Sequence, residues 1–379
     1  MSKATHFSAL VYRLSFLLAC ILLVACSSHT TETLNLCVGT YGGHFYRVTF
    51  NDGKFGNATS IDAANASFLL PTDDGIIFAV SENDPHSGIC SFQGDSLTAF
   101  NSEIGGSPCY LMQIPERPFV LTADYNGGSI SVFDASNGII GERVQCIQYH
   151  GCGPFEGRQQ QAHIHQLRVI PTALCADCGI GGDWLLATDL GSDSVHVLRI
   201  NNTEEGKALL TDCPNQTFPL PPGCGPRHME WNEIQHLLYC ITELSDEVVV
   251  WKLTAENGMP AFTRLQRIKA DDTHASGSAD IHMHPSGRFL YTSHRLKDDG
   301  IVLFRVDEEG RIIRMDKVLT EGHPRHFFIT PDGRFLLAAC RDGHCVQVFA
   351  IDENNGTLSD TGERLYTADD GPVCIARIP

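Results

Sequence analysis

The chain has 379 residues, of which 42% are hydrophobic, and its formal net charge at pH 7 is −18. This amount of apolar material is sufficient for a large folded core. So acidic a surface repels phosphate backbones, and no basic stripe in the sequence offsets it. We therefore expect no nucleic-acid partner.

The N-terminus has the pattern of an export signal. Lys3 and Arg13 precede an apolar run, Leu14 to Val24, that is too short to span a bilayer. The run closes as Leu-Val-Ala-Cys-Ser, which resembles the lipobox of bacterial lipoproteins, where cleavage leaves Cys26 first and lipid attaches to its sulfur. We predict a signal peptide over 1–25, a tether over 26–34, and an exported lipoprotein anchored to a membrane, in the periplasm or at the outer membrane. An ordinary secretory signal is the alternative.

The rest of the chain repeats a short pattern. The clearest copies are P-S-G-R-F-L-Y-T-S-H-R at 285–295 and P-D-G-R-F-L-L-A-A-C-R at 331–341, and C-V-G-T-Y at 37–41 starts the mature chain. Repeats of about 40 to 50 residues are typical of propellers and solenoids. Six runs end at one equivalent position, at Glu82, Tyr125, Leu190, Glu243, Arg295 and Arg341.

Each repeat consists of short β-branched and aromatic runs separated by turn signals such as Pro-Asp-Gly, and no segment sustains a helical stripe. This pattern predicts antiparallel meanders, which bury both faces when they are stacked radially. We predict an all-β fold, a seven-bladed β-propeller of four-stranded antiparallel blades, as one domain over 35–379.

Cysteines are frequent, with fifteen in the chain. Cys175-Ala-Asp-Cys178 falls in an insertion between the first two runs of its blade, and we expect a loop disulfide or free thiols there. A zinc site would need a second ligand pair, and Cys213 and Cys224 are poorly spaced for it. Three cysteines lie within apolar runs and are expected to be small buried side chains: Cys240, Cys340 and Cys374.

Propeller geometry predicts which residues meet. The residue that opens the innermost strand and the residue that closes the second strand lie on one face near the axis. Counting sixteen back from each closing residue gives the openings, and Pro171 aligns the blade with the insertion. The predicted rim contains Ala66, Cys109, His165, Arg227, Ala279 and Arg325 as openings, with Glu82, Asp124, Tyr125, Asn126, His163, Asp189, His228, Glu243, Asp280, His294, Arg295, His323, His326 and Arg341 beside or opposite them. So many charged and imidazole groups at one mouth indicate a functional site, although Asp124 and Asp189 are expected to be structural.

These residues also carry a family resemblance. A-H-I-H at 162–165, G-P-R-H at 225–228, T-E-L at 242–244, S-A-D-I-H at 278–282 and H-R at 294–295 resemble the seven-bladed β-propeller lactonases, which include the propeller-type 6-phosphogluconolactonases and the fungal carboxy-muconate lactonizing enzyme. The resemblance implies a catalytic set of His165, Arg227, Glu243 and Arg295, an anionic lactone or sugar acid as substrate, and no cofactor. The chain departs from the family pattern at Ala162 and His294.

The residue types suit lactone opening. A neutral histidine can deprotonate the attacking water, and guanidinium groups can stabilise the oxyanion. We expect His165 to be the base, oriented by Glu243, with one of Arg227 and Arg295 on the oxyanion and the other on a substrate carboxylate or phosphate. Remaining substrate contacts are expected from His163, His228, Asp280, His294, Arg325, His326, Tyr125, Asn126, Glu82 and Arg341.

Alternatives remain open at this point. Glu243 could be the base with His165 as the acid, and the same groups suit a lactonizing cycloisomerase. A non-catalytic, lipid-anchored binding propeller for a glycan or protein is the alternative from a different class. A serine nucleophile is disfavoured because no Gly-x-Ser-x-Gly elbow precedes a helix. No metal is expected, although His163 and His165 are spaced to share one.

Overall fold

The computed structural model describes residues 32–83, 86–202 and 208–379. The predicted signal peptide and Cys26 lie outside these ranges. The first strand begins at Leu34, one residue before the predicted start of the propeller. Within the described part of the chain, no helix has the length and apolar character needed to cross a bilayer.

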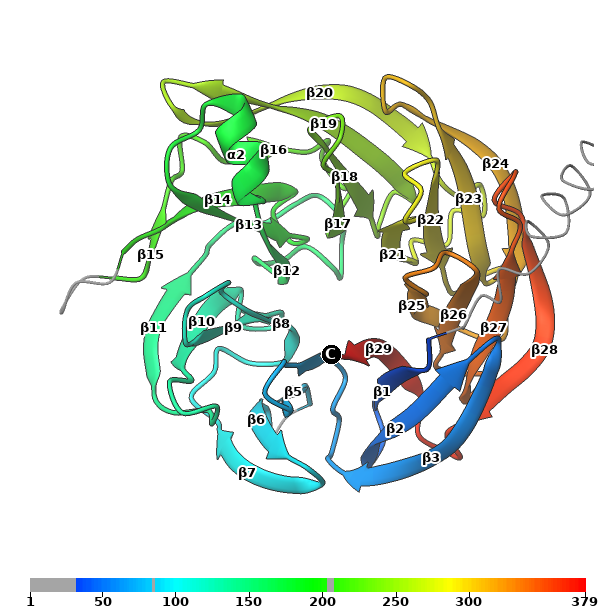
Figure 1. Cartoon of the computed structure of the whole chain (residues 1–379). Coiled ribbons are helices and arrows are strands. Elements are labelled where there is room, and N and C mark those ends of the chain that lie inside the picture. The colour runs from blue at the N-terminus through cyan, green and yellow to red at the C-terminus, as the bar shows by residue number, and fades with distance from the viewer. Residues whose placement is uncertain (1–31, 84–85, 203–207) are drawn as a thin grey trace, which may run out of the picture. The chain divides into compact units, whose positions relative to one another are not determined.

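The described residues form seven antiparallel sheets arranged as a ring, which confirms the predicted seven-bladed propeller (Figure 1). Strands are named below from the axis outward. The first blade is β29 (Pro372–Ile378), β1 (Leu34–Thr40), β2 (His44–Asn51) and β3 (Lys54–Asp62). The second is β4 (Leu69–Pro71), β5 (Ile76–Ser81), β6 (Gly88–Gln93) and β7 (Ser96–Asn101), and the third is β8 (Pro108–Gln113), β9 (Phe119–Asp124), β10 (Ser129–Asp134) and β11 (Arg143–Gln148).

The fourth blade is β12 (Ile164–Val169), β13 (Asp183–Asp189), β14 (Ser194–Ile200) and β15 (Leu210–Asp212), and the short β16 (Phe218–Pro219) also pairs with β14. The fifth is β17 (Pro226–Asn232), β18 (Leu237–Thr242), β19 (Glu247–Glu256) and β20 (Met259–Lys269). The sixth is β21 (Ser278–Met283), β22 (Phe289–His294), β23 (Gly300–Val306) and β24 (Ile312–Leu319), and the seventh is β25 (Pro324–Ile329), β26 (Phe335–Cys340), β27 (Cys345–Ile351) and β28 (Leu358–Tyr366).

The insertion in the fourth blade is a helix, which corrects the expected loop. Helix α2 (Thr172–Cys178) follows Pro171 and ends at Gly179, whose φ of 72° provides the left-handed cap. The short helix forms because Leu174 and Cys175 turn inward and pack against the core. Cys175 is buried and Cys178 partly buried, and both are free thiols. The three cysteines predicted to be small core side chains are indeed buried.

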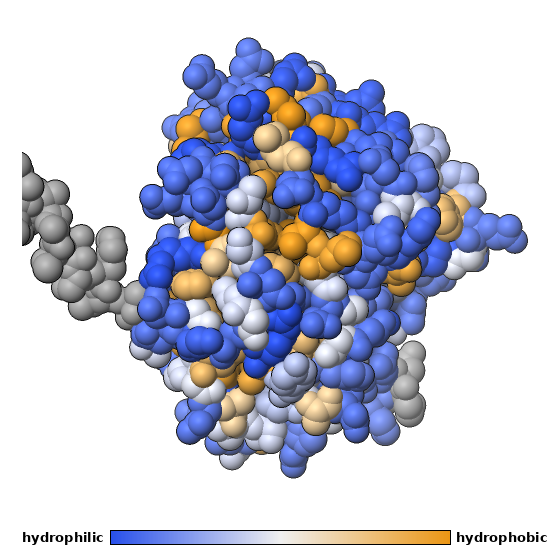
Figure 2. Space-filling model, turned by 90° about the vertical axis from the view of Figure 1, so that its right-hand side faces the viewer, coloured by the Kyte–Doolittle hydropathy of each residue, from blue (hydrophilic) through white to orange (hydrophobic). Residues whose placement is uncertain are grey.

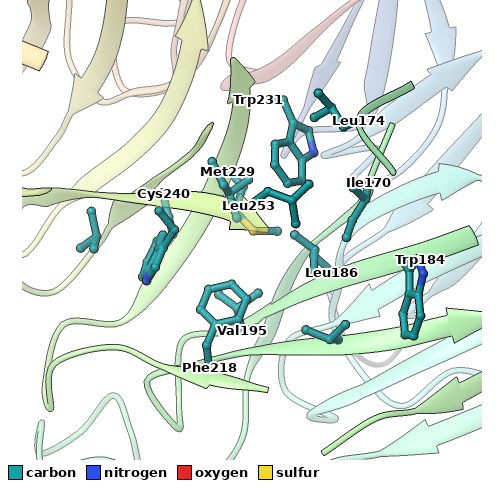
Figure 3. Close-up of a cluster of buried hydrophobic side chains, with 14 of the residues drawn as sticks. Ile170, Leu174, Trp184, Leu186, Val195, Phe218, Met229, Trp231, Cys240 and Leu253 are labelled. Carbon is teal, nitrogen blue, oxygen red and sulfur yellow. The ribbon is translucent and has the colours of Figure 1, made fainter. Parts of the chain in front are cut away.

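Apolar clusters between neighbouring sheets hold the ring together. Figure 3 shows the cluster between the fourth and fifth blades, where Leu186 lies near Met229 and Leu253, and Trp184 lies at the edge of the cluster. Phe218 from β16 stacks edge-on against Trp251 with ring centroids 5.2 Å apart. Each fully buried side chain of this size contributes about 1.5–3 kcal/mol. Stability is therefore distributed around the ring rather than concentrated in one core.

The outer surface is mostly polar. Figure 2 shows one side of the molecule, on which hydrophilic residues predominate and apolar residues occur in small groups. Exposed large apolar side chains include Met315, Leu319 and Tyr366 on outermost strands. Scattered apolar residues of this kind are normal on soluble surfaces.

The first blade joins the two ends of the ring. β1 pairs with β29 in register, with Val38 opposite Ile375. The innermost strand of this sheet therefore comes from the C-terminus and its other three strands from the start of the propeller. Sheet hydrogen bonds thus close the ring between segments more than 300 residues apart.

Replacing Ile375 with alanine tests this closure. Ile375 is 3% exposed, and truncating a buried isoleucine costs about 2–5 kcal/mol. We expect Ile375→Ala to lower the free energy of unfolding by that amount in urea denaturation. Leu319→Ala, at a position 63% exposed, is the control and should change it by less than about 0.5 kcal/mol. Equal effects of the two variants would contradict closure through β29.

Candidate active site

One backbone hydrogen bond recurs in all seven blades and defines the rim of the site. The N–H of the closing residue donates to a carbonyl just before the innermost strand. These seven donors are Tyr41, Glu82, Tyr125, Leu190, Glu243, Arg295 and Arg341. The predicted closing positions therefore lie on one face, next to the start of the innermost strands.

The opening residues are placed by β-bulges. In β12 and β13, Ile164 pairs with Asp189 and Gln166 with Thr188, so that His165 has no partner in the ladder. Arg227, Arg325 and Cys109 occupy the same unpaired position in their blades, and the register also shifts at this place in the first and sixth blades. A bulge re-aims the extra side chain. The second blade differs, because β4 begins only at Leu69 and its ladder is regular.

Three guanidinium groups bind the carboxylate of Glu243. Arg158 Nη2 donates to its Oε1 at 2.6 Å, while Arg227 Nε and Arg295 Nη2 lie 2.9 and 3.2 Å from its Oε2. Arg227, Arg295 and Glu243 are almost fully buried, whereas the Arg158 side chain is 36% exposed. Burial alone would raise the pKa of Glu243, but the arginines lower it to about 2. We call Glu243 with Arg158, Arg227 and Arg295 the arginine cluster.

His165 lies beside this cluster. Its ring is 5.2 Å from that of His228 and 5.7 Å from that of Tyr125. Its Nδ1 is buried and has no hydrogen-bond partner among the described residues. Burial, and then the positive charge of Arg227, lowers the pKa of His165 well below its ordinary value. The imidazole is therefore neutral at physiological pH.

Glu243 does not orient His165, contrary to the sequence-based expectation. Both carboxylate oxygens of Glu243 are bound by arginines, and no hydrogen bond joins the two residues in the described structure. Aromatic contacts position this part of the rim instead. Tyr125 stacks on His163 with centroids 4.3 Å apart and receives a hydrogen bond from Arg158 on its hydroxyl.

A second group lies at the first, second and seventh blades. The Tyr41 hydroxyl donates to Glu82 Oε1 at 3.0 Å, and Arg325 Nη2 is 3.9 Å from the same oxygen. The Arg325 guanidinium also lies 5.4 Å from the centre of the Tyr41 ring, where a cation–π contact is favourable. We call Glu82, Tyr41 and Arg325 the Glu82 group. Arg325 interacts electrostatically with both Glu82 and Glu243, which links this group to the arginine cluster.

One step further along the innermost strands, Asp280 binds three histidines. His228 Nδ1 lies 2.7 Å from Asp280 Oδ1, and His282 and His326 lie 2.9 and 3.5 Å from Oδ2. Burial would lower the pKa of His282, but Asp280 and Glu230 raise it to about 10. Asp280 therefore fixes the histidines beneath the rim, and His228 in turn contacts Arg227 at 3.3 Å.

Part of this network has the composition of a metal site. Among the described residues, Asp280, His282 and His326 offer donor atoms within 4.8 Å of one another. The Ile375 N–H donates to His326 Nδ1 at 3.3 Å, so the neutral ring carries its proton on Nε2, the atom facing Asp280. A metal-bound imidazole instead has its proton on the nitrogen away from the metal. The geometry fits a hydrogen-bonded network rather than a cation site.

Three predicted substrate contacts have side chains that bond within their own blades. His294 bonds to Ser278 and Thr292 at 2.9 and 2.8 Å, inside its blade. Asn126 donates to Ser107, and Arg341 turns to Asp342. By contrast, His163, His165, Arg227, His228, Glu243, Arg295, Tyr125, Glu82 and Arg325 are joined by the contacts described above.

Sequence reasoning missed two participants. Arg158 lies in the connection between β11 and β12, outside the repeat frame, so counting could not reach it. Tyr41 follows the run at 37–40, and its equivalence to Glu82 and Tyr125 was a usable signal. The predicted structural roles of Asp124 and Asp189 are confirmed: Asp124 accepts from Ser129 and Ser131, and Asp189 from Ser192 and the His163 N–H.

Comparisons with known proteins agree with this architecture. A family model described as "Lactonase, 7-bladed beta-propeller" matches residues 35–376. A 6-phosphogluconolactonase of Bacillus subtilis is 29% identical over 334 residues, covering 85% of this chain and 87% of that protein. The crystal structure of a candidate 6-phosphogluconolactonase from Bacteroides fragilis is 34% identical with a TM-score of 0.82, covering 93% of this chain and 100% of that one. A second from Bacteroides uniformis is 32% identical with a TM-score of 0.79, covering 91% and 99%.

Glu243→Gln should destabilise the protein strongly at neutral pH. The change leaves buried arginines without their counter-ion, and breaking a buried ion pair costs about 3–5 kcal/mol. The pKa of Glu243 in the folded protein is lowered to about 2. The stabilisation by the ionised carboxylate is therefore fully present above the pKa of the unfolded state and is lost as pH falls from there through the folded pKa. Urea unfolding should show a larger deficit at pH 7 than at pH 3. Glu321→Gln, at a side chain 48% exposed, is the control and should behave like the wild type at both pH values.

Proposed function

Because the chain belongs to the seven-bladed β-propeller lactonase family, we propose that it hydrolyses an anionic lactone at the axial mouth, with His165 as general base. The observation that carries this assignment is the buried Nδ1 of His165, which has no partner in the described structure and lies beside the arginine cluster. A neutral imidazole has one ring nitrogen with a free lone pair, and such a lone pair is what proton abstraction from water requires.

In the first step, water attacks the lactone carbonyl carbon while a ring nitrogen of the neutral His165 imidazole takes its proton. The carbonyl oxygen becomes an oxyanion and needs a fixed positive charge nearby. Arg227 is suited to this role, since it contacts His228, whose ring lies against that of His165. Its Nε and Nη1 are held by Glu243 and the Ala279 carbonyl, while its Nη2 has no hydrogen bond to the described residues.

In the second step, the tetrahedral intermediate collapses and the ring carbon–oxygen bond breaks. The leaving alkoxide takes the proton from the imidazolium of His165, which regenerates the neutral base and releases a hydroxy acid. One water is consumed, and no external proton is gained or lost before the acid ionises. The same residue thus acts as base and then as acid.

Glu243 serves in this proposal as a counter-ion rather than as a base. A carboxyl group with a pKa of about 2 that is bound by three arginines has little affinity for a proton. What it does is hold the guanidinium groups in fixed positions before substrate arrives, which is the preorganisation that electrostatic catalysis needs. His165 is therefore favoured over Glu243 as the general base.

The charge of the arginine cluster supports an anionic substrate. Three guanidinium groups face one carboxylate, and the excess positive charge is retained in a strongly acidic protein. Arg158 is the most exposed of the three and is suited to grip a carboxylate or phosphate through a two-pronged contact. The relatives named as 6-phosphogluconolactonases support a sugar-acid lactone.

His165→Ala and Arg227→Ala should each lower kcat/KM on lactones by at least 100-fold, because each removes a group required in the transition state. Since the pKa of His165 is well below 6.5, the base is already neutral above that pH. The acid limb of the wild-type kcat/KM profile should therefore fall below pH 6.5. Lactone opening is followed by pH-stat titration of the acid released.

The control is His344→Asn, at an exposed histidine outside the proposed machinery, which should retain wild-type rates. A wild-type protein that opens no lactone in a broad panel would instead favour the binding-propeller reading. Activity that survives His165→Ala would show that another group is the base.

We also propose that the chain is exported and lipidated at Cys26, which would place the mouth outside the cytoplasm. The support is the charged, apolar and Leu-Val-Ala-Cys pattern of the first 26 residues. Export would direct the activity to an extracytoplasmic sugar-acid lactone.

Labelling bacteria with radioactive palmitate tests the anchor. The wild type should incorporate label and sediment with membranes, whereas Cys26→Ala should do neither, because only a lipid on Cys26 holds it there. Cys146→Ala, at an exposed cysteine of the propeller, is the control and should stay labelled. An unlabelled wild type found in the soluble fraction would indicate an ordinary secretory signal.

A further inference from the structure

The Glu82 group contains a polar atom that the proposed reaction does not use. Glu82 Oε1 is held by the Tyr41 hydroxyl and faces Arg325. Oε2 of the same carboxylate is buried and has no hydrogen-bond partner among the described residues. A buried charged oxygen without a donor is costly, so this atom is prepared to receive one from a ligand.

Two neighbours fix the direction in which this carboxylate points. Tyr41 and Glu82 occupy the equivalent closing positions of adjacent blades, and both have the rim hydrogen bond from their N–H. Tyr41 contacts both other members of the group: its hydroxyl donates to Glu82, and its ring face lies against the Arg325 guanidinium. Of the two carboxylate oxygens, Oε2 alone remains without a partner among the described residues.

The Glu82 group and the arginine cluster differ in charge. The arginine cluster has more guanidinium groups than carboxylates, whereas the Glu82 group pairs one carboxylate with one guanidinium. An anion bound near the arginine cluster would be repelled by a carboxylate, so Glu82 is suited to a different part of the same ligand. That part must donate a hydrogen bond without bearing negative charge, and an alcohol hydroxyl meets both conditions.

We propose that Glu82 is a specificity-determining residue, whose Oε2 accepts a hydrogen bond from a hydroxyl group of a polyhydroxylated lactone while Tyr41 holds Oε1. The inference rests on the proposed function and narrows its substrate class. A site built to bond a hydroxyl rejects analogues that lack it, because its own buried polar atom is then left unpaired. Aliphatic lactones of the same ring size are therefore poor substrates.

The test compares D-glucono-δ-lactone with δ-valerolactone, which has the same ring without hydroxyls. Glu82→Ala should lower kcat/KM for the hydroxylated lactone about 10- to 100-fold, the range for a hydrogen bond to a charged group, and change it less than threefold for δ-valerolactone. Glu82→Gln keeps an acceptor oxygen and should lose less than Glu82→Ala. Tyr41→Phe, which frees Oε1, should affect only the hydroxylated lactone.

Glu321→Gln is the matched control. Glu321 lies on a connection before an innermost strand and forms an ion pair with Arg364. The variant should leave kcat/KM unchanged for both lactones. Unfolding midpoints of all variants establish that they are folded. Calorimetric binding of D-gluconate and hexanoate repeats the comparison without turnover: Glu82→Ala should weaken gluconate binding 10- to 100-fold and leave that of hexanoate as it is.

The outcomes separate the two proposals. A wild type that opens no lactone refutes the hydrolase, while the gluconate and hexanoate titrations still decide the role of Glu82. A wild type that opens both lactones, together with a Glu82→Ala variant that loses activity equally on both or on neither, overturns the hydroxyl contact and leaves the hydrolase standing.

Discussion

The site depends on one constraint, the pairing of β29 with β1 that closes the ring. Each blade supplies only a few side chains to the mouth, and the blades that carry Glu82, His165, Glu243 and Arg325 lie far apart along the chain. They meet because every innermost strand starts at the same end of a closed ring. An open array of the same sheets would leave these charged groups separated and in water.

Closure alone would not make a reactive site, because strand side chains alternate and half of them face neighbouring blades. The bulges at the starts of the innermost strands turn His165, Arg227 and Arg325 out of that alternation. Burial then acts in opposite directions on the two kinds of group. It keeps His165 neutral, while the concentrated arginines keep Glu243 ionised. A base and a positive field are thus held within one mouth.

Much of this was predictable from the sequence. The repeat frame located the blades and the closing residues, and it gathered the four family-matched residues around the mouth. It failed where a residue lies outside the repeat, as Arg158 does, or where the first blade is divided between the two ends of the chain, as at Tyr41. The direction of the His294 side chain was predictable. His294 holds the same blade position as Asp124 and Asp189, one residue before the closing residue. Strand alternation turns all three side chains into their blades.

The relation of Glu243 to its neighbours was not predictable. A sequence can place a carboxylate, a histidine and several arginines at one rim. Which of them pair depends on differences of a few ångströms in the positions of the side-chain ends. Helix α2 was missed for a similar reason. Its seven residues are too few to give a periodic signal, and they become helical because the neighbouring core receives Leu174 and Cys175.

The unpaired position at the start of most of the innermost strands has an evolutionary consequence. Since the bulged residue has no cross-strand partner, its side chain can change without disturbing the ladder around it. Cys109 and Val373 occupy such positions here, in the same frame as His165 and Arg227. Propellers of this design thus have positions around the axis at which single substitutions can change the side chain, so that new chemistry can arise while the scaffold stays the same.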